Sequence, residues 1–305
     1  MTQAIYRGRF APSPSGPLHF GSLVTAVGSY LDARAHGGEW LLRIDDLDPP
    51  RVVPGATDAI LRALDAHGFE WDGPVHYQSQ RDEAYAAAFE TLQRMGAVYA
   101  CGCTRREIAD SVVGLPGGAV YPGTCRGGLA PGKEPRAFRV NTAGARVEFQ
   151  DRLQGRIAQD MEKEAGDYVV FRADGLFAYQ LAVVVDDAGQ GITDIVRGSD
   201  LLDSTSRQIH LQKLLGLPIP NYLHLPVVIN ELGEKLSKQT LAPALDVARP
   251  QPALWGALDF LGQQPPRELS AAGVAEIWTW AMANWREDSL PRSRVRPLAQ
   301  VNGLS

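Results

Sequence analysis

The sequence predicts an α/β protein built around a doubly wound parallel sheet, and three observations support this fold class. Strand-like and helix-like segments alternate through the first third of the chain, an order typical of parallel sheets. The same alternation returns after residue 166. Between these two parts lies a segment rich in glycine and proline that contains all the cysteines, and this change in composition predicts an insertion.

The first third is expected to contain two strands and three helices. The stretches 5–10 (IYRGRF) and 39–44 (EWLLRI) have the apolar character of strands. The helices are predicted by apolar side chains at helical spacing, namely Leu23, Val27, Tyr30 and Leu31 after Ser22, then Ile60, Leu61 and Leu64 before Gly68, and then Tyr85, Phe89, Leu92 and Met95.

Later segments are assigned in the same way. Short alternating strands are expected at 136–141 and 146–151 within the insertion, and apolar strands at 167–172, 176–187 and 222–230. One helix between them is predicted by four apolar side chains, Ile209, Leu211, Leu214 and Leu215.

Two further helices are expected in residues 242–305. They are indicated by Leu254, Trp255, Leu258 and Phe260, and by Val274, Ile277, Trp278, Ala281 and Trp285. Ser270 is well placed to cap the second helix. The helical spacing of the tryptophans favours packing in a core over stacking on nucleic-acid bases.

Charge and cysteine content narrow the functional class. The 305 residues carry a formal net charge of −5, which argues against a protein that coats RNA or DNA but not against an enzyme with a local basic patch. Three cysteines are too few, and odd in number, for a secreted disulfide scaffold. The N-terminus has no signal-like apolar core, and the apolar stretch 181–185 is too short to span a bilayer. A soluble cytoplasmic protein is therefore expected.

The segment 9–23 (RFAPSPSGPLHFGSL) is the first candidate for a functional site. His19 and Gly21 lie at an expected helix start, where backbone N–H groups and the helix dipole favour anions. Gly16 and Gly21 would allow a ligand to approach the backbone. A proline-stiffened connection capped by Ser22 explains the same residues equally well, so this segment alone decides nothing.

A second segment, residues 235–239 (KLSKQ), changes the interpretation. A lysine pair is usually a solvated surface feature, but together with His19-Phe20-Gly21-Ser22 it resembles the HIGH and KMSKS motifs of class I aminoacyl-tRNA synthetases. Longer segments at 9–23, 41–51, 77–81 and 196–209 resemble glutamyl-tRNA synthetases, and the likeness extends from about Tyr6 to Leu241.

Within that branch the chain resembles the glutamyl-Q tRNA(Asp) synthetases, because it has no room for a large helical anticodon-binding region and contains a CxC…YxxxC element. The resemblance implies activation of L-glutamate by ATP with Mg²⁺, without tRNA, and transfer of glutamate to queuosine in the anticodon of tRNA(Asp). It also implies a monomer that does not bind membranes. Two alternatives remain open: a compact glutamyl-tRNA synthetase that charges the tRNA 3′ end, and a non-catalytic tRNA-binding paralogue.

The resemblance also implies a division into parts. Residues 1–98 and 166–241 would be two halves of a Rossmann-like catalytic domain, 99–165 an inserted zinc-bearing subdomain, and 242–305 a short helical C-terminal region.

Site residues are carried over by position. The expected glutamate-binding residues are Arg9, Phe10, Ala11, Pro12, Ser13, Asp45, Tyr179 and Arg197. Asp45 would face the substrate ammonium, where the family usually has glutamate. The expected ATP-binding residues are His19, Gly21, Ser22, Lys235 and Lys238, with His19 and Lys238 as the catalytic pair. His67, His76 and His224 are interpreted as structural or exposed.

The cysteine segment predicts a metal site. Cys101, Cys103 and Cys125 supply three thiolates, which by themselves favour zinc and simple packing about equally. The family resemblance adds Tyr121 as a fourth ligand and implies one structural zinc ion.

Overall fold

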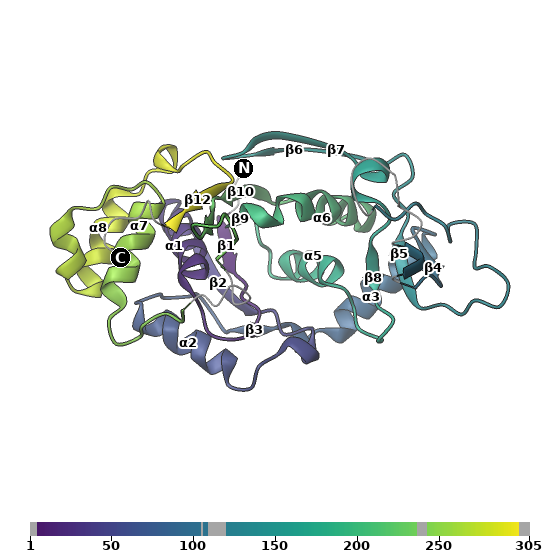
Figure 1. Cartoon of the computed structure of the whole chain (residues 1–305), viewed down its shortest axis with the longest axis horizontal. Coiled ribbons are helices and arrows are strands. Elements are labelled where there is room, and N and C mark those ends of the chain that lie inside the picture. The colour runs from purple at the N-terminus through teal and green to yellow at the C-terminus, as the bar shows by residue number, and fades with distance from the viewer. Residues whose placement is uncertain (1–4, 105, 109–119, 237–242, 299–305) are drawn as a thin grey trace.

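The centre of the protein is formed by parallel strands, as the computed structural model shows for residues 5–104, 106–108, 120–236 and 243–298 (Figure 1). One sheet has the order β1-β2-β3 and a second has the order β7-β6-β10-β9. The strand bounds are β1 Arg7–Phe10, β2 Glu39–Ile44, β3 His76–Tyr77, β6 Arg146–Asp151, β7 Gly155–Asp160, β9 Asp194–Gly198 and β10 Asn221–Leu225. All pairings are parallel except that of β6 with β7.

The two sheets meet along β1 and β9. The Thr193 backbone N–H donates to the Arg7 carbonyl at 3.0 Å, and the Arg7 N–H donates to Thr193 Oγ1 at 2.8 Å. The chain reverses its strand order here, since β2 lies on one side of β1 and β10 on the far side of β9. The predicted mixed α/β fold with parallel sheets is thus confirmed.

Helices pack against the strands in two apolar cores. The helix bounds are α1 Phe20–Ala35, α2 Ala56–Ala66, α3 Asp82–Arg94, α5 Tyr179–Gly189, α6 Leu202–Leu215, α7 Pro250–Phe260 and α8 Val274–Asn284. One core joins Leu23 of α1 and Leu42 of β2 to α7 and α8. The other joins Leu181 of α5 and Ile209 of α6 to the second sheet. None of the helices in the described residues is long and apolar enough to cross a membrane.

Four details of the sequence prediction are wrong. Residues 179–187 are part of helix α5 and not a strand. The stretch 222–230 is broken at Pro226, and β11 (Val227–Ile229) pairs with β12 (Val295–Pro297) instead of continuing β10. Ser270 lies in a separate 3₁₀ turn, and Gly273 precedes α8. Met95 lies just after α3, which ends at Arg94, and its side chain is exposed.

The segment between the two halves contributes strands to two sheets. β4 (Val98–Cys101), β5 (Ala137–Val140) and β8 (Val169–Phe171) form an antiparallel sheet at one end of the molecule, opposite α7 and α8 (Figure 1). The hairpin β6–β7 instead extends the second central sheet, since Asp151 pairs with Tyr222. The boundaries at residues 98, 165 and 241 remain predictions.

The C-terminal helices complete the first core through Trp278. Its ring packs edge-on against Tyr30 and Phe69, and its indole N–H donates to the His67 carbonyl at 2.8 Å. Gly68 has a φ of +73°, and a Cβ there would lie 3.0 Å from the indole nitrogen. Glycine is therefore required where α8 approaches the end of α2.

We expect Trp278→Ala to lower the free energy of unfolding by about 3–5 kcal/mol, because it opens a cavity and leaves the His67 carbonyl unpaired. Urea unfolding followed by circular dichroism would measure the loss. Thr279→Ala, at an exposed neighbouring position on α8, is the matched control. Equal stabilities of the two variants would show that α8 does not contribute to the core in this way.

Candidate functional site

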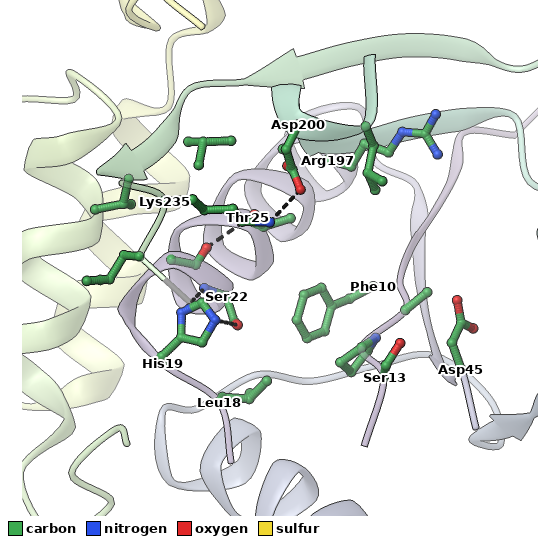
Figure 2. A pocket seen from close by; sticks show the side chains of 18 of the residues that line it. Phe10, Ser13, Leu18, His19, Ser22, Thr25, Asp45, Arg197, Asp200 and Lys235 are labelled. Carbon is green, nitrogen blue, oxygen red and sulfur yellow. Dashed lines mark hydrogen bonds and ion pairs between the residues drawn. The ribbon is translucent and has the colours of Figure 1, made fainter. Parts of the chain in front are cut away.

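A cavity of about 900 Å³ opens at the carboxyl ends of β1 and β9, where the two sheets meet (Figure 2). Ligands of open α/β sheets bind at such a reversal of strand order. The cavity is lined by most of the predicted site residues: Arg9, Phe10, Ala11, Pro12, Ser13, His19, Gly21, Ser22, Asp45, Tyr179, Arg197 and Lys235. Lys238 lies outside the described residues. The structure therefore gathers side chains separated by more than two hundred positions, while their roles remain predictions.

His19 caps α1 at the cavity wall. Its Nδ1 accepts the Ser22 backbone N–H at 3.3 Å, and its Nε2 lies 3.2 Å from Ser22 Oγ. The helix begins at Phe20, so the alternative in which Ser22 caps it is wrong. The amino end of α1 thus lies at the cavity beside an imidazole, and the end of a helix dipole favours an anion there.

The two motif segments approach each other at Gly21. A Cβ on Gly21 would lie 3.1 Å from the His19 ring and 3.5 Å from the Leu236 carbonyl oxygen, so only a small residue leaves both undisturbed. Lys235 forms an ion pair with Asp200 at 2.5 Å (Figure 2). Sequence reasoning missed Asp200, which lines the cavity, although it lies inside the matched segment 196–209.

Four charged side chains of alternating sign lie in a row on the other side of the cavity. Arg9 donates to both carboxylate oxygens of Asp187, at 3.1 and 3.3 Å. Arg43 donates to Asp187 Oδ1 and to Asp45 Oδ1, each at 2.7 Å. All four are at most 6% exposed. Sequence reasoning identified the two ends of this row but missed Arg43 and Asp187.

The two carboxylates of the row differ in their protonation. Burial alone would raise the pKa of Asp187, but the guanidinium groups of Arg9 and Arg43 together hold it below its usual value. At Asp45 burial prevails over the attraction of Arg43 and raises the pKa to about 6. Of the two carboxylates in this row, Asp45 is therefore the one whose pKa lies closer to neutral pH.

Arg197 and Tyr179 complete the wall. Tyr179 is the first residue of α5, and Arg197 lies on β9 with 3% of its surface exposed. The Arg197 guanidinium donates to His224 Nε2 at 3.1 Å and to Thr205 Oγ1 at 2.7 Å. His224 is fully buried, in agreement with a structural interpretation, but its contact with a cavity residue was not foreseen.

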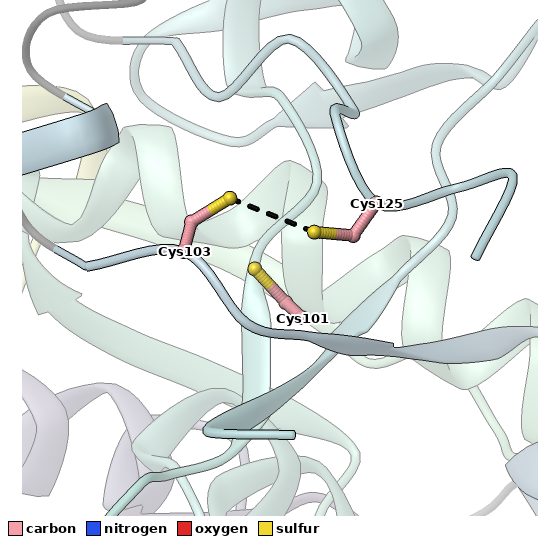
Figure 3. Close-up of side chains that lie close together, drawn as sticks. All are labelled: Cys101, Cys103 and Cys125. Atoms are coloured by element: carbon pink, nitrogen blue, oxygen red, sulfur yellow. Dashed lines mark hydrogen bonds between the residues drawn. The ribbon is translucent and has the colours of Figure 1, made fainter. Parts of the chain in front are cut away.

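The three cysteines converge at the end of β4 (Figure 3). Their Sγ atoms lie within 4.8 Å of one another, and all three are free thiols. The Tyr121 hydroxyl oxygen lies 3.4 Å from Cys101 Sγ and 3.6 Å from Cys103 Sγ, and it accepts the Cys125 N–H at 3.1 Å. Four donor atoms thus surround one point.

Three of the donor separations, those of the Tyr121 oxygen from Cys101 and Cys103 and of Cys103 from Cys125, fit a metal ion of zinc's size. Bond lengths near 2.3 Å for sulfur and 2.0 Å for oxygen place the donors of a four-coordinate zinc about 3.5–3.8 Å apart. The Cys103 and Cys125 sulfurs are 3.5 Å apart. Arg139 stacks over the Tyr121 ring at 4.0 Å and donates to Cys101 Sγ at 3.4 Å, so a cation already faces the donors.

Comparison with known protein families gives a match over most of the chain. Residues 6–112 and 130–251 match the catalytic domain of class I tRNA synthetases for glutamate and glutamine. The unmatched residues 113–129 include Tyr121 and Cys125, two of the four donors of the cysteine cluster.

Individual relatives agree with this family. The chain is 61% identical over 292 residues to a glutamyl-Q tRNA(Asp) synthetase of Dechloromonas aromatica, covering 95% of this chain and 97% of the relative. It is 60% identical to one of Aromatoleum aromaticum, covering 94% and 91%. Its fold matches a glutamate tRNA ligase of Elizabethkingia meningosepticum, solved with its amino acid, with a TM-score of 0.75 at 22% identity over 96% of this chain and 67% of that one.

The raised pKa of Asp45 predicts a pH-dependent stability. Because the folded pKa of about 6 exceeds that of an unfolded aspartate, the folded state binds the proton more tightly. Lowering the pH from 7 to 4 should therefore stabilise the wild type relative to Asp45→Asn, by at most about 3 kcal/mol. Urea unfolding of both proteins across this range would test it; a difference that is flat or of opposite sign would contradict the prediction.

Proposed function

Since the chain belongs to the class I tRNA synthetases for glutamate and glutamine, we propose that it activates L-glutamate with ATP, without tRNA, and transfers it to queuosine in the anticodon of tRNA(Asp). The single observation that carries the proposal is the cavity that brings Arg9, Asp45 and Arg197 together with His19 and Lys235. Relatives named for this activity, similar over almost their whole length, support it.

The part of the cavity around Arg9, Asp45 and Arg197, here called the amino-acid half, has charges that complement those of glutamate. Glutamate carries two carboxylates and one ammonium, and the cavity offers two arginines, Arg9 and Arg197, and one carboxylate, Asp45. Asp45 accepts from Arg43 through one carboxylate oxygen and also lines the cavity (Figure 2). Phe10, Ala11, Pro12, Ser13 and Tyr179 would shape the remaining wall.

The nucleotide half suits a triphosphate. The amino end of α1, with His19, Gly21 and Ser22, would hold the phosphates, and Lys235 would add a positive charge. Lys238 is proposed to stabilise charge at the α-phosphate. Mg²⁺ bound with ATP would neutralise further phosphate charge, and we assign it no protein ligand.

The proposed reaction needs positioning and charge stabilisation rather than a protein nucleophile. A glutamate carboxylate oxygen bonds to the α-phosphorus as the bond to the β-phosphate oxygen breaks, and pyrophosphate leaves. A hydroxyl of the queuosine cyclopentenediol then attacks the acyl carbon of the adenylate. The ester forms, AMP leaves, and the hydroxyl proton is released.

The activation step is tested by glutamate-dependent ATP–pyrophosphate exchange in the absence of tRNA. We expect exchange by the wild type and at least about a tenfold lower kcat/KM for ATP in Lys235→Met, because a cation at the phosphates is lost. Lys213→Met, at an exposed lysine of α6, is the matched control. Wild-type protein without exchange would overturn the proposal.

The acceptor is tested separately with labelled glutamate. We expect transfer to tRNA(Asp) that contains queuosine even after its 3′-terminal nucleotide is removed, and none to the same tRNA without queuosine. The reverse pattern would assign a conventional charging activity at the 3′ end.

A zinc ion held by Cys101, Cys103, Cys125 and Tyr121 is part of the proposal, and its role would be structural because four protein ligands leave no open position. Metal analysis should find one zinc per chain, lost in Cys101→Ser and Cys125→Ser and bound more weakly in Tyr121→Phe. Tyr99→Phe, a neighbour packed on the cluster, should keep it. Full zinc retention in both serine variants would show that the site is elsewhere.

A further inference from the structure

Arg197 is held in an unusual way for a buried arginine. Its Nε and Nη2 donate to an imidazole nitrogen and a hydroxyl oxygen, respectively. In the part of the chain that the structure describes, no carboxylate lies within salt-bridge distance of its guanidinium. Its Nη1 is buried and has no hydrogen-bond partner among these residues. Buried polar atoms normally have one, and an incoming carboxylate oxygen would supply it.

Arg9, the other arginine of the amino-acid half, is held differently. Two of its nitrogens donate to the two oxygens of Asp187, so a buried negative charge already compensates its own. The positive charge of Arg197 is fixed in place by neutral groups instead. In a site of low dielectric constant, such a charge attracts a substrate carboxylate more strongly than one already paired.

The tautomer of His224 depends on Asp151. Asp151 Oδ1 accepts the backbone N–H groups of Leu153 and Gln154 at 3.0 and 2.8 Å, and Oδ2 lies 2.6 Å from His224 Nδ1. Burial opposes ionisation of Asp151, but these donors keep its pKa below the usual value. Asp151 is therefore an acceptor only, which requires the proton of His224 to be on Nδ1.

This tautomer leaves a lone pair on Nε2, directed at the Arg197 Nε–H. Burial lowers the pKa of His224 although Asp151 opposes it, and this favours the neutral ring. A ring with its proton on Nε2 could donate to Thr205 Oγ1, 3.0 Å away, but it would have no lone pair there to accept the Arg197 Nε–H. Asp151 thus sets the tautomer, and the tautomer determines whether Nε2 can accept the Arg197 N–H.

We propose that Asp151 and His224 are positioning residues that hold Arg197 with neutral acceptors, so that its full charge is available to a carboxylate of the amino-acid substrate. Thr205 supplies the second acceptor. The proposal rests on the proposed function, since it assigns a receptor for glutamate. A purely structural tie between β6 and β10 would also use the Asp151–His224 bond, but it would not depend on which nitrogen carries the proton.

The decisive variant is Asp151→Asn, which keeps the shape and replaces the acceptor facing Nδ1 by an amide N–H. The ring must then accept at Nδ1 and carry its proton on Nε2. We expect the KM for glutamate in pyrophosphate exchange to rise about tenfold, with the KM for ATP unchanged. NMR of isotope-labelled histidine should show protonated Nδ1 in the wild type and protonated Nε2 in the variant.

Further variants at His224 and Thr205 distinguish the loss of a hydrogen-bond acceptor for Arg197 from a general loss of folding. His224→Gln can place an amide oxygen near the Nε2 position, so it should bind glutamate better than His224→Phe, which has no acceptor. Thr205→Val removes the second acceptor, together with the contacts of the same hydroxyl with His224 Nε2 and the Leu201 carbonyl, and should raise the KM for glutamate in the same selective way. His210→Phe is the control, because His210 is also buried but contacts Tyr168 and not Arg197.

The outcomes are distinguishable. Wild-type exchange with an unchanged glutamate KM in folded Asp151→Asn and Thr205→Val would overturn the inference alone. A wild-type ring protonated on Nε2 would overturn it without any activity measurement. Wild-type protein that shows no glutamate-dependent exchange would overturn the proposed function and the inference with it.

Discussion

The row Arg9–Asp187–Arg43–Asp45 is the constraint on which the cavity depends. Burying a charge costs several kcal/mol unless an opposite charge and hydrogen bonds compensate it, and here each inner charge is shared by two neighbours. The four side chains come from β1, α5 and β2 or the residue after it. Because no member of the row can be buried without its neighbours, the row fixes how β1, β2 and α5 pack against one another. This packing in turn sets the position of the sheet edge that forms the cavity.

Three cationic side chains that line the cavity differ in how their positive charge is compensated. Arg9 is compensated by a buried carboxylate, Lys235 is paired with the half-exposed Asp200, and Arg197 is held by neutral acceptors. The amino end of α1 adds partial positive charge without any side chain. Although the chain is acidic overall, the cavity is lined by four cationic side chains, Arg9, Arg51, Arg197 and Lys235, and by two carboxylates, Asp45 and Asp200.

Local pattern predicted much of this fold. The strand 39–44 was placed at its observed bounds, because an apolar run ends there in an acidic turn. The run LFAYQLAVVV is apolar on all sides, and periodicity alone cannot tell a buried strand from a buried helix. The local pattern could not predict the residues that support the cavity, because their contacts join segments far apart in the sequence. Asp187 lies 144 positions from Arg43, and Asp151 meets His224 only through the register of β6 beside β10.

The cysteine cluster is attached to the cavity by backbone pairing. Cys101 pairs with Ala137 of β5, Phe138 of β5 pairs with Phe171 of β8, and the Ala178 N–H donates to the Val170 carbonyl immediately before Tyr179. Two strand pairings and one hydrogen bond thus separate the thiols from the cavity wall. The cluster is therefore tied to the first turn of α5 by continuous strand pairing and not by a linker alone.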